Sequence, residues 1–154
     1  RFNHDDLGWN YRLTNLQAAL GLSQLKNIKN TIKKKMQIGN DYYEKLKFNN
    51  NIQILPPFNS FSKNIYWVVG ILIKNKKMTA LNLSKKLLKF GIETQPFFWP
   101  MHQQSIFKKL KLFKNKNYPN STYLSKYGLY VPSYFFLKKK EINKIKNVIN
   151  KILK

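Results

Sequence analysis

Residues 4–22 read HDDLGWNYRLTNLQAALGL, and the character of this stretch changes at its midpoint. As far as Arg12 the residues are mostly polar or aromatic and include a glycine, which is typical of an irregular loop. From Thr14 the pattern indicates a helix, because Thr14 is a favourable N-cap and Gln17 three residues later completes a capping box. A loop fixed to a capped helix can hold Asn10 and Arg12 in defined positions. On the pattern alone, the simpler interpretation is a structured loop that leads into a core helix.

The helical pattern extends far beyond this stretch. Apolar residues recur at intervals of three or four, which predicts one long helix from residue 14 to about residue 48. Gly39 and Asn40 weaken the pattern and mark the expected place of a kink. A helix of this length needs another surface to lie against, so we expect the chain by itself to be less stable than its size suggests and to associate.

Strands and helices alternate after residue 50. The patterns predict strands over residues 52–55, 65–73, 92–98 and 129–131, and helices over residues 79–90, 103–112, 121–126 and 137–153. Residues 65–73 are apolar on both faces, which indicates a central strand. Pro96 and Pro100 would keep the strand over residues 92–98 at an edge or end it early. No repeat or linker interrupts this region. We therefore predict an α/β fold, with a loop and long helix over residues 1–50 and a small α/β domain over residues 51–154.

The composition argues against several classes of protein. The net charge is +23, but 27 of the 29 basic residues are lysine, because only Arg1 and Arg12 are arginines. Nucleic-acid readers favour the bidentate fork of arginine, and these lysines are scattered, so we expect no nucleic-acid partner. Cysteine is absent, which excludes disulfides and thiolate metal ligands, and we expect no metal site. No apolar run could span a bilayer and no signal-peptide pattern opens the sequence, so we expect a cytoplasmic protein without a membrane partner.

Three segments resemble one family. Residues 8–25, GWNYRLTNLQAALGLSQL, resemble the signature of the DegT/DnrJ/EryC1/StrS family of pyridoxal-phosphate-dependent sugar aminotransferases. Residues 91–102, GIETQPFFWPMH, are similar to a segment of its perosamine-synthase-like branch, and residues 125–133, SKYGLYVPS, give a third match. The resemblance covers nearly the whole chain but only the C-terminal portion of a family member. It implies the C-terminal part of a fold-type I transferase, whose residues 1–50 link to a large cofactor domain that this sequence lacks.

Two residues of the opening loop are candidates for binding, and the resemblance assigns a role to the first. It implies that Asn10 donates across a dimer interface to the phosphate of the partner's pyridoxal 5'-phosphate, while the alternative is an asparagine that only tolerates a turn. Arg12 is the one internal arginine of a lysine-rich sequence, which indicates a need for bidentate binding of a carboxylate or phosphate of the substrate. The alternative is an ion pair with Asp5 or Asp6 that braces the loop.

Two further residues are implied to face the substrate. His102 follows the Pro-Phe-Phe-Trp-Pro-Met run and would donate to a sugar hydroxyl or a pyrophosphate oxygen, unless it only makes a structural hydrogen bond. Gln95 stands where similar sequences often carry arginine, so the pyrophosphate contact is weakened there or moves to a lysine such as Lys108. Phe97 and Trp99 could line the floor of a pocket, but aromatic residues at a strand end are more often core.

No residue of this sequence is predicted to be catalytic. In the family the lysine that forms the Schiff base with the cofactor belongs to an upstream segment, so we expect these 154 residues alone to be inactive. The intact enzyme is expected to be a homodimer with shared active sites. It would transfer an amino group, with glutamate as the expected donor, to a 4-keto-6-deoxy nucleotide sugar for O-antigen or other surface polysaccharide. The alternatives are a dehydratase of the same family, in which histidine replaces the lysine, and a non-catalytic basic binding module.

Overall fold

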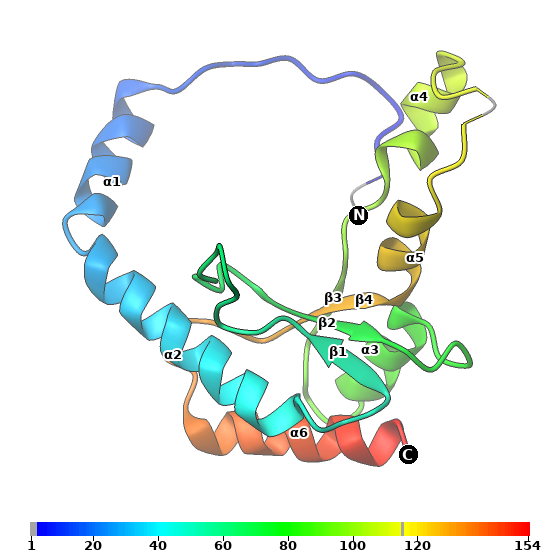
Figure 1. Ribbon diagram of the computed structural model, residues 1–154. Coiled ribbons are helices and arrows are strands. Elements are labelled where there is room, and N and C mark those ends of the chain that lie inside the picture. Colours follow the sequence, from blue (N-terminus) through cyan, green and yellow to red (C-terminus); the bar gives the residue numbers. More distant parts are fainter. Residues whose placement is uncertain (1–2, 115) are drawn as a thin grey trace.

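A four-stranded antiparallel sheet organises the molecule (Figure 1). The computed structural model describes residues 3–114 and 116–154, so the first two residues of the predicted loop and Asn115 lie outside the described residues. The strands are β1 (Ile52–Ile54), β2 (Val69–Ile73), β3 (Gln95–Pro96) and β4 (Gly128–Val131), in the order β1-β2-β4-β3. The helices are α1 (Asn15–Leu25), α2 (Ile28–Leu46), α3 (Ala80–Leu88), the 3-10 helix η1 (Met101–Gln103), α4 (Ser105–Lys109), α5 (Pro119–Tyr127) and α6 (Lys139–Ile152).

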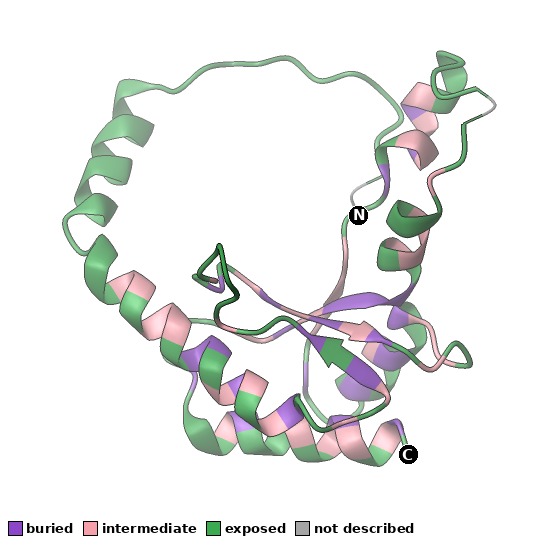
Figure 2. Ribbon diagram, in the orientation of Figure 1, coloured by how far each residue is buried: buried purple, intermediate pink, exposed green. Residues whose placement is uncertain are grey.

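The core lies between one face of the sheet and helices α2, α3 and α6 (Figure 2). In β2 the side chains of Val69, Ile71 and Ile73 are buried, while Gly70 and Leu72 turn to the opposite face. This alternation follows from the two-residue repeat of a strand. The strand lies between β1 and β4, which confirms its predicted central position, and the sheet with its helices confirms the α/β class.

The long helix is broken at residues 26–27, not at residues 39–40. Helix α1 ends at Leu25, and α2 runs without interruption through Gly39, so the predicted position of the kink was wrong. The glycine has a different role, since a Cβ atom at this position would overlap the ring of Tyr66. Gly39 therefore allows a close approach between α2 and the segment that precedes β2.

Strand β2 is shorter than the sequence predicts. Tyr66 has a φ of 51°, a left-handed conformation that no strand contains. Its ring is 2% exposed, its backbone N–H donates to Asn64 Oδ1, and its hydroxyl donates to the Leu55 carbonyl at 3.0 Å. These contacts turn the chain away from the sheet, so the strand begins only at Val69.

Other boundaries also move, although each predicted helix has a counterpart. Thr79 caps α3 by accepting from the Asn82 N–H, and Gly91 follows this helix with a φ of 71°. The predicted helix over residues 103–112 is shortened to α4, with η1 just before it, and β3 keeps only two residues of the predicted strand over residues 92–98.

Every described residue from position 3 to position 30 is exposed (Figure 2). Helix α1 has the predicted capping box between Thr14 and Gln17 but buries none of its residues. Its apolar side chains include Leu16 at 82% and Leu20 at 64% exposure. The face that the sequence predicts to need a partner therefore meets none within the described chain.

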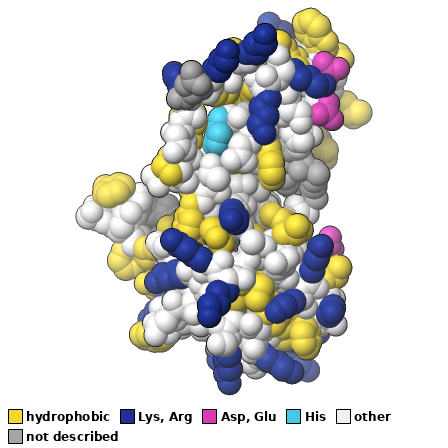
Figure 3. All heavy atoms as spheres, turned by 90° about the vertical axis from the view of Figure 1, so that its right-hand side faces the viewer, with side chains coloured by type: hydrophobic (Ala, Val, Ile, Leu, Met, Phe, Trp, Pro, Cys, Tyr) yellow, Lys and Arg dark blue, Asp and Glu magenta, His cyan; other side chains and the backbone are white. Residues whose placement is uncertain are grey.

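The charged surface has no single basic patch on the face shown in Figure 3. Lysine and arginine side chains are spread over this face among hydrophobic ones, with few acidic groups between them. No helix among the described residues is long and apolar enough to cross a membrane.

Candidate functional site

A cavity of about 730 Å³ lies along the free edge of β3. Its walls come from the start of α3, from β3 and the residues that flank it, and from η1 and α5. The lining residues are Thr79, Leu81, Glu93, Thr94, Gln95, Pro96, Phe97, Trp99, Gln103, Thr122, Ser125 and Lys126. The volume is in the range that small-molecule sites occupy. We refer to it as the β3 cavity.

The edge of β3 is closed to strand addition. The strand pairs only with β4, through the register Gln95 to Tyr130 and Pro96 to Leu129. Pro96 has no N–H to offer a further strand, and Thr94 already uses its carbonyl to accept from the Ser84 hydroxyl. The space beside β3 therefore suits a small molecule better than an extended peptide.

Aromatic residues form the apolar part of the β3 cavity. The ring of Phe97 lies over Gly70 and Gly128 of two adjacent strands, where any Cβ atom would collide with it. It stacks on Tyr130 with ring centroids 4.6 Å apart, and burial raises the pKa of Tyr130 above its ordinary value. Trp99 is fixed by a hydrogen bond from its Nε1–H to the Gln103 carbonyl at 3.0 Å. Phe97 and Trp99 thus line the cavity.

The polar part is centred on Thr122 of α5. The Thr122 Oγ1 atom accepts from Gln103 Nε2 at 3.1 Å and lies 3.2 Å from His102 Nε2. The imidazole of His102 also packs on the Tyr118 ring, with centroids 4.9 Å apart. The structure therefore brings two of the predicted site residues to one region, with Gln95 in the cavity wall and His102 next to Thr122, which lines the cavity.

The cation of the β3 cavity is Lys126, one turn after Thr122 on the same face of α5. Lys108, the lysine that the sequence suggested for this role, is on α4 and lines none of the described cavities. Sequence reasoning missed Thr122 and Lys126, since no local pattern shows that α5 packs beside η1. The available signal was Pro119, a favoured first residue of a helix, which puts Thr122, Ser125 and Lys126 on one face.

The opening segment is attached at one end only. The His4 N–H donates to Gln104 Oε1 at 2.9 Å, the Ile106 N–H donates to the His4 carbonyl at 3.0 Å, and Lys109 Nζ donates to the Asp5 carbonyl at 3.2 Å. After these contacts the chain runs in a wide arc to α1 (Figure 1). The backbone of His4 therefore fastens the start of this segment to η1 and α4.

Asn10 and Arg12 are in this arc, apart from the β3 cavity. The Asn10 Oδ1 atom accepts from the Arg12 N–H at 2.9 Å, which makes the turn that the sequence allowed as an alternative. Arg12 has a φ of 58°, a conformation rare outside glycine and enriched at functional sites. Within the described chain the Asn10 Nδ2 group has no partner, and no ion pair joins Arg12 to Asp5 or Asp6. The turn therefore presents an amide donor and a guanidinium to solvent.

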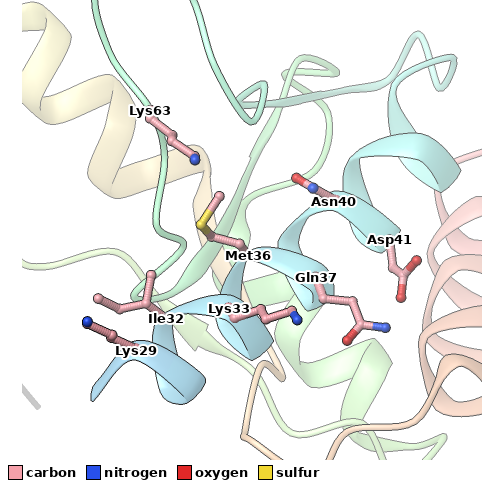
Figure 4. Close-up of a pocket in the computed structure, with 8 residues that line it drawn as sticks. All are labelled: Lys29, Ile32, Lys33, Met36, Gln37, Asn40, Asp41 and Lys63. Atoms are coloured by element: carbon pink, nitrogen blue, oxygen red, sulfur yellow. The ribbon is translucent and has the colours of Figure 1, made fainter. Parts of the chain in front are cut away.

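A second hollow of about 620 Å³ lies on another surface (Figure 4). Seven of its lining residues are on α2, and Lys63 faces them from the segment before β2. Lys29, Lys33 and Lys63 make it cationic, while its one acid, Asp41, is 3.8 Å from Lys139. No group of three or more metal-ligating side chains occurs among the described residues. This shallow basic hollow brings together no set of groups for catalysis.

One lysine outside these cavities is electrostatically unusual. Burial lowers the pKa of Lys35, whose Nζ donates to the Ser133 carbonyl at 2.6 Å. The ammonium group is thus held by the backbone between β4 and α6, and Lys35 does not line the β3 cavity.

Comparison with known proteins gives consistent matches. A model of the DegT/DnrJ/EryC1/StrS aminotransferase family matches residues 1–152. GDP-perosamine synthase of Escherichia coli O157:H7 is 33% identical over 153 residues, which cover 96% of this chain and 38% of that protein. Helicobacter pylori PseC, an aminotransferase of pseudoaminic acid biosynthesis, has the same fold with a TM-score of 0.77, 24% identity and coverage of 96% and 39%. E. coli GDP-4-keto-6-deoxy-D-mannose-3-dehydratase, solved with bound hydrated PLP, gives a TM-score of 0.70 at 22% identity, with coverage of 96% and 37%.

Proposed function

Because the chain belongs to the DegT/DnrJ/EryC1/StrS aminotransferase family, we propose that it is the C-terminal portion of a pyridoxal-phosphate-dependent nucleotide-sugar aminotransferase. The match of the family model to residues 1–152 carries this proposal. The chain spans 38% of the length of the GDP-perosamine synthase that it resembles, so the activity belongs to a larger protein. That protein would act in the cytoplasm as a homodimer and transfer an amino group from glutamate to a 4-keto-6-deoxy nucleotide sugar for surface-polysaccharide synthesis.

Asn10 is the residue of this chain that fits the cofactor phosphate. Its Oδ1 is engaged by the Arg12 N–H, which fixes the orientation of the amide and leaves the two Nδ2 hydrogens exposed. A neutral amide can donate to a phosphate oxygen without a counter-charge of its own. When bound, pyridoxal phosphate supplies the electron sink for chemistry at the amino-bearing carbon. We propose that Asn10 holds the phosphate of the cofactor in the neighbouring subunit, and that Arg12 binds an anionic group of the substrate.

The β3 cavity fits the nucleotide-sugar side of the proposal. Trp99 and Phe97 offer apolar surface for a ring, Gln95 offers an uncharged amide, and Lys126 supplies the positive charge that position 95 lacks. This arrangement supports a substrate with both a ring and an acidic group. The pyrophosphate contact would then be made by Lys126 and not by Lys108.

Dehydration of a nucleotide sugar is a second candidate for the reaction of the intact enzyme, because this chain shares its fold with a dehydratase. The likeness to the 3-dehydratase shows that this fold also accommodates dehydration. In the family a histidine in place of the Schiff-base lysine distinguishes the two reactions, and that position is not within the 154 residues. Incubation of the intact enzyme with glutamate and GDP-4-keto-6-deoxymannose decides between them by the sugar product, since only the aminotransferase forms an amino sugar.

Three variants of the intact enzyme test the role of Asn10. Asn10→Asp keeps an oxygen for the Arg12 N–H but replaces the Nδ2 donor by a negative charge, whereas Asn10→Ala removes both. If Asn10 holds the phosphate, cofactor affinity falls about 10-fold in the alanine variant and further in the aspartate variant, because repulsion is added to the lost hydrogen bond. Asn10→Ser is the matched control, since it keeps a short acceptor for the turn and adds no charge. Equal affinities, or alanine as the weakest variant, would show that Asn10 only forms the turn.

A further inference from the structure

The hydrogen bonds around Thr122 have a direction that can be worked out from their donors. The Thr122 hydroxyl has one proton to donate, and its oxygen can accept two hydrogen bonds. Gln103 Nε2 is an amide nitrogen and can only donate, so its bond of 3.1 Å ends on the Thr122 oxygen. The remaining neighbour is His102 Nε2 at 3.2 Å, a nitrogen that donates in one tautomer and accepts in the other.

The need of the Thr122 hydroxyl for a hydrogen-bond acceptor determines the tautomer of His102. Among the described residues, His102 Nε2 is the one acceptor within reach of the Thr122 proton. With Nε2 unprotonated, the chain runs from Gln103 to Thr122 to His102, every member is satisfied, and each bond strengthens the next. With Nε2 protonated, two donors meet on Thr122 and its own proton has no protein acceptor.

The other nitrogen of the ring then carries the proton. The ring of His102 packs on Tyr118, and among the described residues its Nδ1 makes no hydrogen bond. The hydrogen bond made by one ring nitrogen sets the state of the other. We propose that Thr122 is a positioning residue that holds His102 as the Nδ1–H tautomer, so that the ring donates to an unprotonated oxygen of the substrate, such as a phosphoryl or keto oxygen. Only the identity of the substrate rests on the proposed function.

The tautomer can be measured without turnover. The sequence has two histidines, so the His4→Gln variant assigns the ring signals of His102 in nitrogen–proton correlation spectra of isotope-labelled protein. At about pH 8.5, where an ordinary imidazole is neutral, we expect a protonated Nδ1 and an unprotonated Nε2. Thr122→Val, which keeps the shape but has no hydroxyl, should lose this pattern, and Thr122→Ser should restore it. An Nε2–H ring in the parent protein, or the same spectrum in the valine variant, would overturn the proposal.

A binding measurement tests whether the tautomer matters to a ligand. With GDP as the probe, we expect Thr122→Val to weaken binding about 3- to 10-fold and Thr122→Ser to keep it within about 2-fold of the parent. Unchanged GDP affinity in the valine variant would overturn the assignment of His102 to the ligand. Failure of the proposed function gives a different result, in which the spectra and GDP binding respond as expected but no amino sugar forms with glutamate.

Discussion

Substitution of Gly39 by alanine tests the packing of Tyr66 against α2. On an exposed helix this change would stabilise the protein by about 0.8–1.0 kcal/mol, because alanine is the better helix former. In this structure the added Cβ atom would overlap the ring of Tyr66, which is 2% exposed. The ring must therefore move, and the sign of the effect should reverse.

The size of the loss follows from the burial of the ring. An aromatic side chain buries about 150–250 Å². At about 25 cal/mol per Å², expulsion of half of the Tyr66 ring costs about 2–3 kcal/mol. The hydrogen bond from its hydroxyl to the Leu55 carbonyl contributes a further 0.5–1.5 kcal/mol or so. After the gain in helix propensity is subtracted, we expect Gly39→Ala to lower the free energy of unfolding by about 1.5–4 kcal/mol.

Urea denaturation followed by far-UV circular dichroism measures this loss. Gly21→Ala is the matched control, because nothing lies within 4 Å of a Cβ atom at that helical position, and it should cause no loss. In a Tyr66→Ala background the ring is gone, so Gly39→Ala should there stabilise by about 1 kcal/mol. A stabilising effect in the parent protein, or an equal loss in both backgrounds, would refute the steric argument.

Three further outcomes follow from other features. Burial raises the pKa of Tyr66 to about 12 from 10.0, so on raising the pH the unfolded chain loses this proton before the folded protein does. The stability that Tyr66 contributes is therefore complete below about pH 10 and falls as the pH rises toward 12. Tyr66→Phe should make this fall smaller, as measured by urea midpoints across the pH range. The exposed apolar face of α1 should drive self-association of the protein. Leu20→Lys should therefore lower the sedimentation coefficient measured at high protein concentration, and a parent protein that is monomeric at this concentration would contradict the prediction. Thr14→Ala should cost α1 about 1 kcal/mol, seen as faster amide exchange in α1 but not in α6, and equal exchange would argue against the cap.

Local signals in the sequence were sufficient for the parts of the fold that depend on neighbours along the chain. The capping box of Thr14 and Gln17 and the cap at Thr79 were predicted from short patterns and are present. The edge position of β3 was predicted from Pro96 and Pro100 and is present. The left-handed turn at Tyr66 was not predicted, because it depends on how segments distant in sequence pack together. The break before α2 was also not predicted, although it lies among exposed residues with local contacts only.

The same distinction applies to the candidate site. Gln95 and His102 could be proposed from their motif, and the structure brings both beside one cavity. Thr122 and Lys126 belong to α5, and their relevance appears only once α5 is placed against η1 and β3. For Asn10, the turn and the proposed contact with phosphate use different atoms of one amide, so the two interpretations that the sequence left open are compatible.

The packing of the Phe97 ring on two glycines limits which residues can replace one another at this site in related proteins. Its ring occupies space that would otherwise belong to side chains at positions 70 and 128 on two neighbouring strands. Positions 70 and 97 share one volume, so a larger residue at position 70 is compatible only with a smaller one at position 97. A side chain at position 128 would also meet the backbone carbonyl of Leu124, so this glycine is required whatever residue stands at position 97. We therefore expect positions 70 and 97 to change together among relatives while position 128 stays glycine.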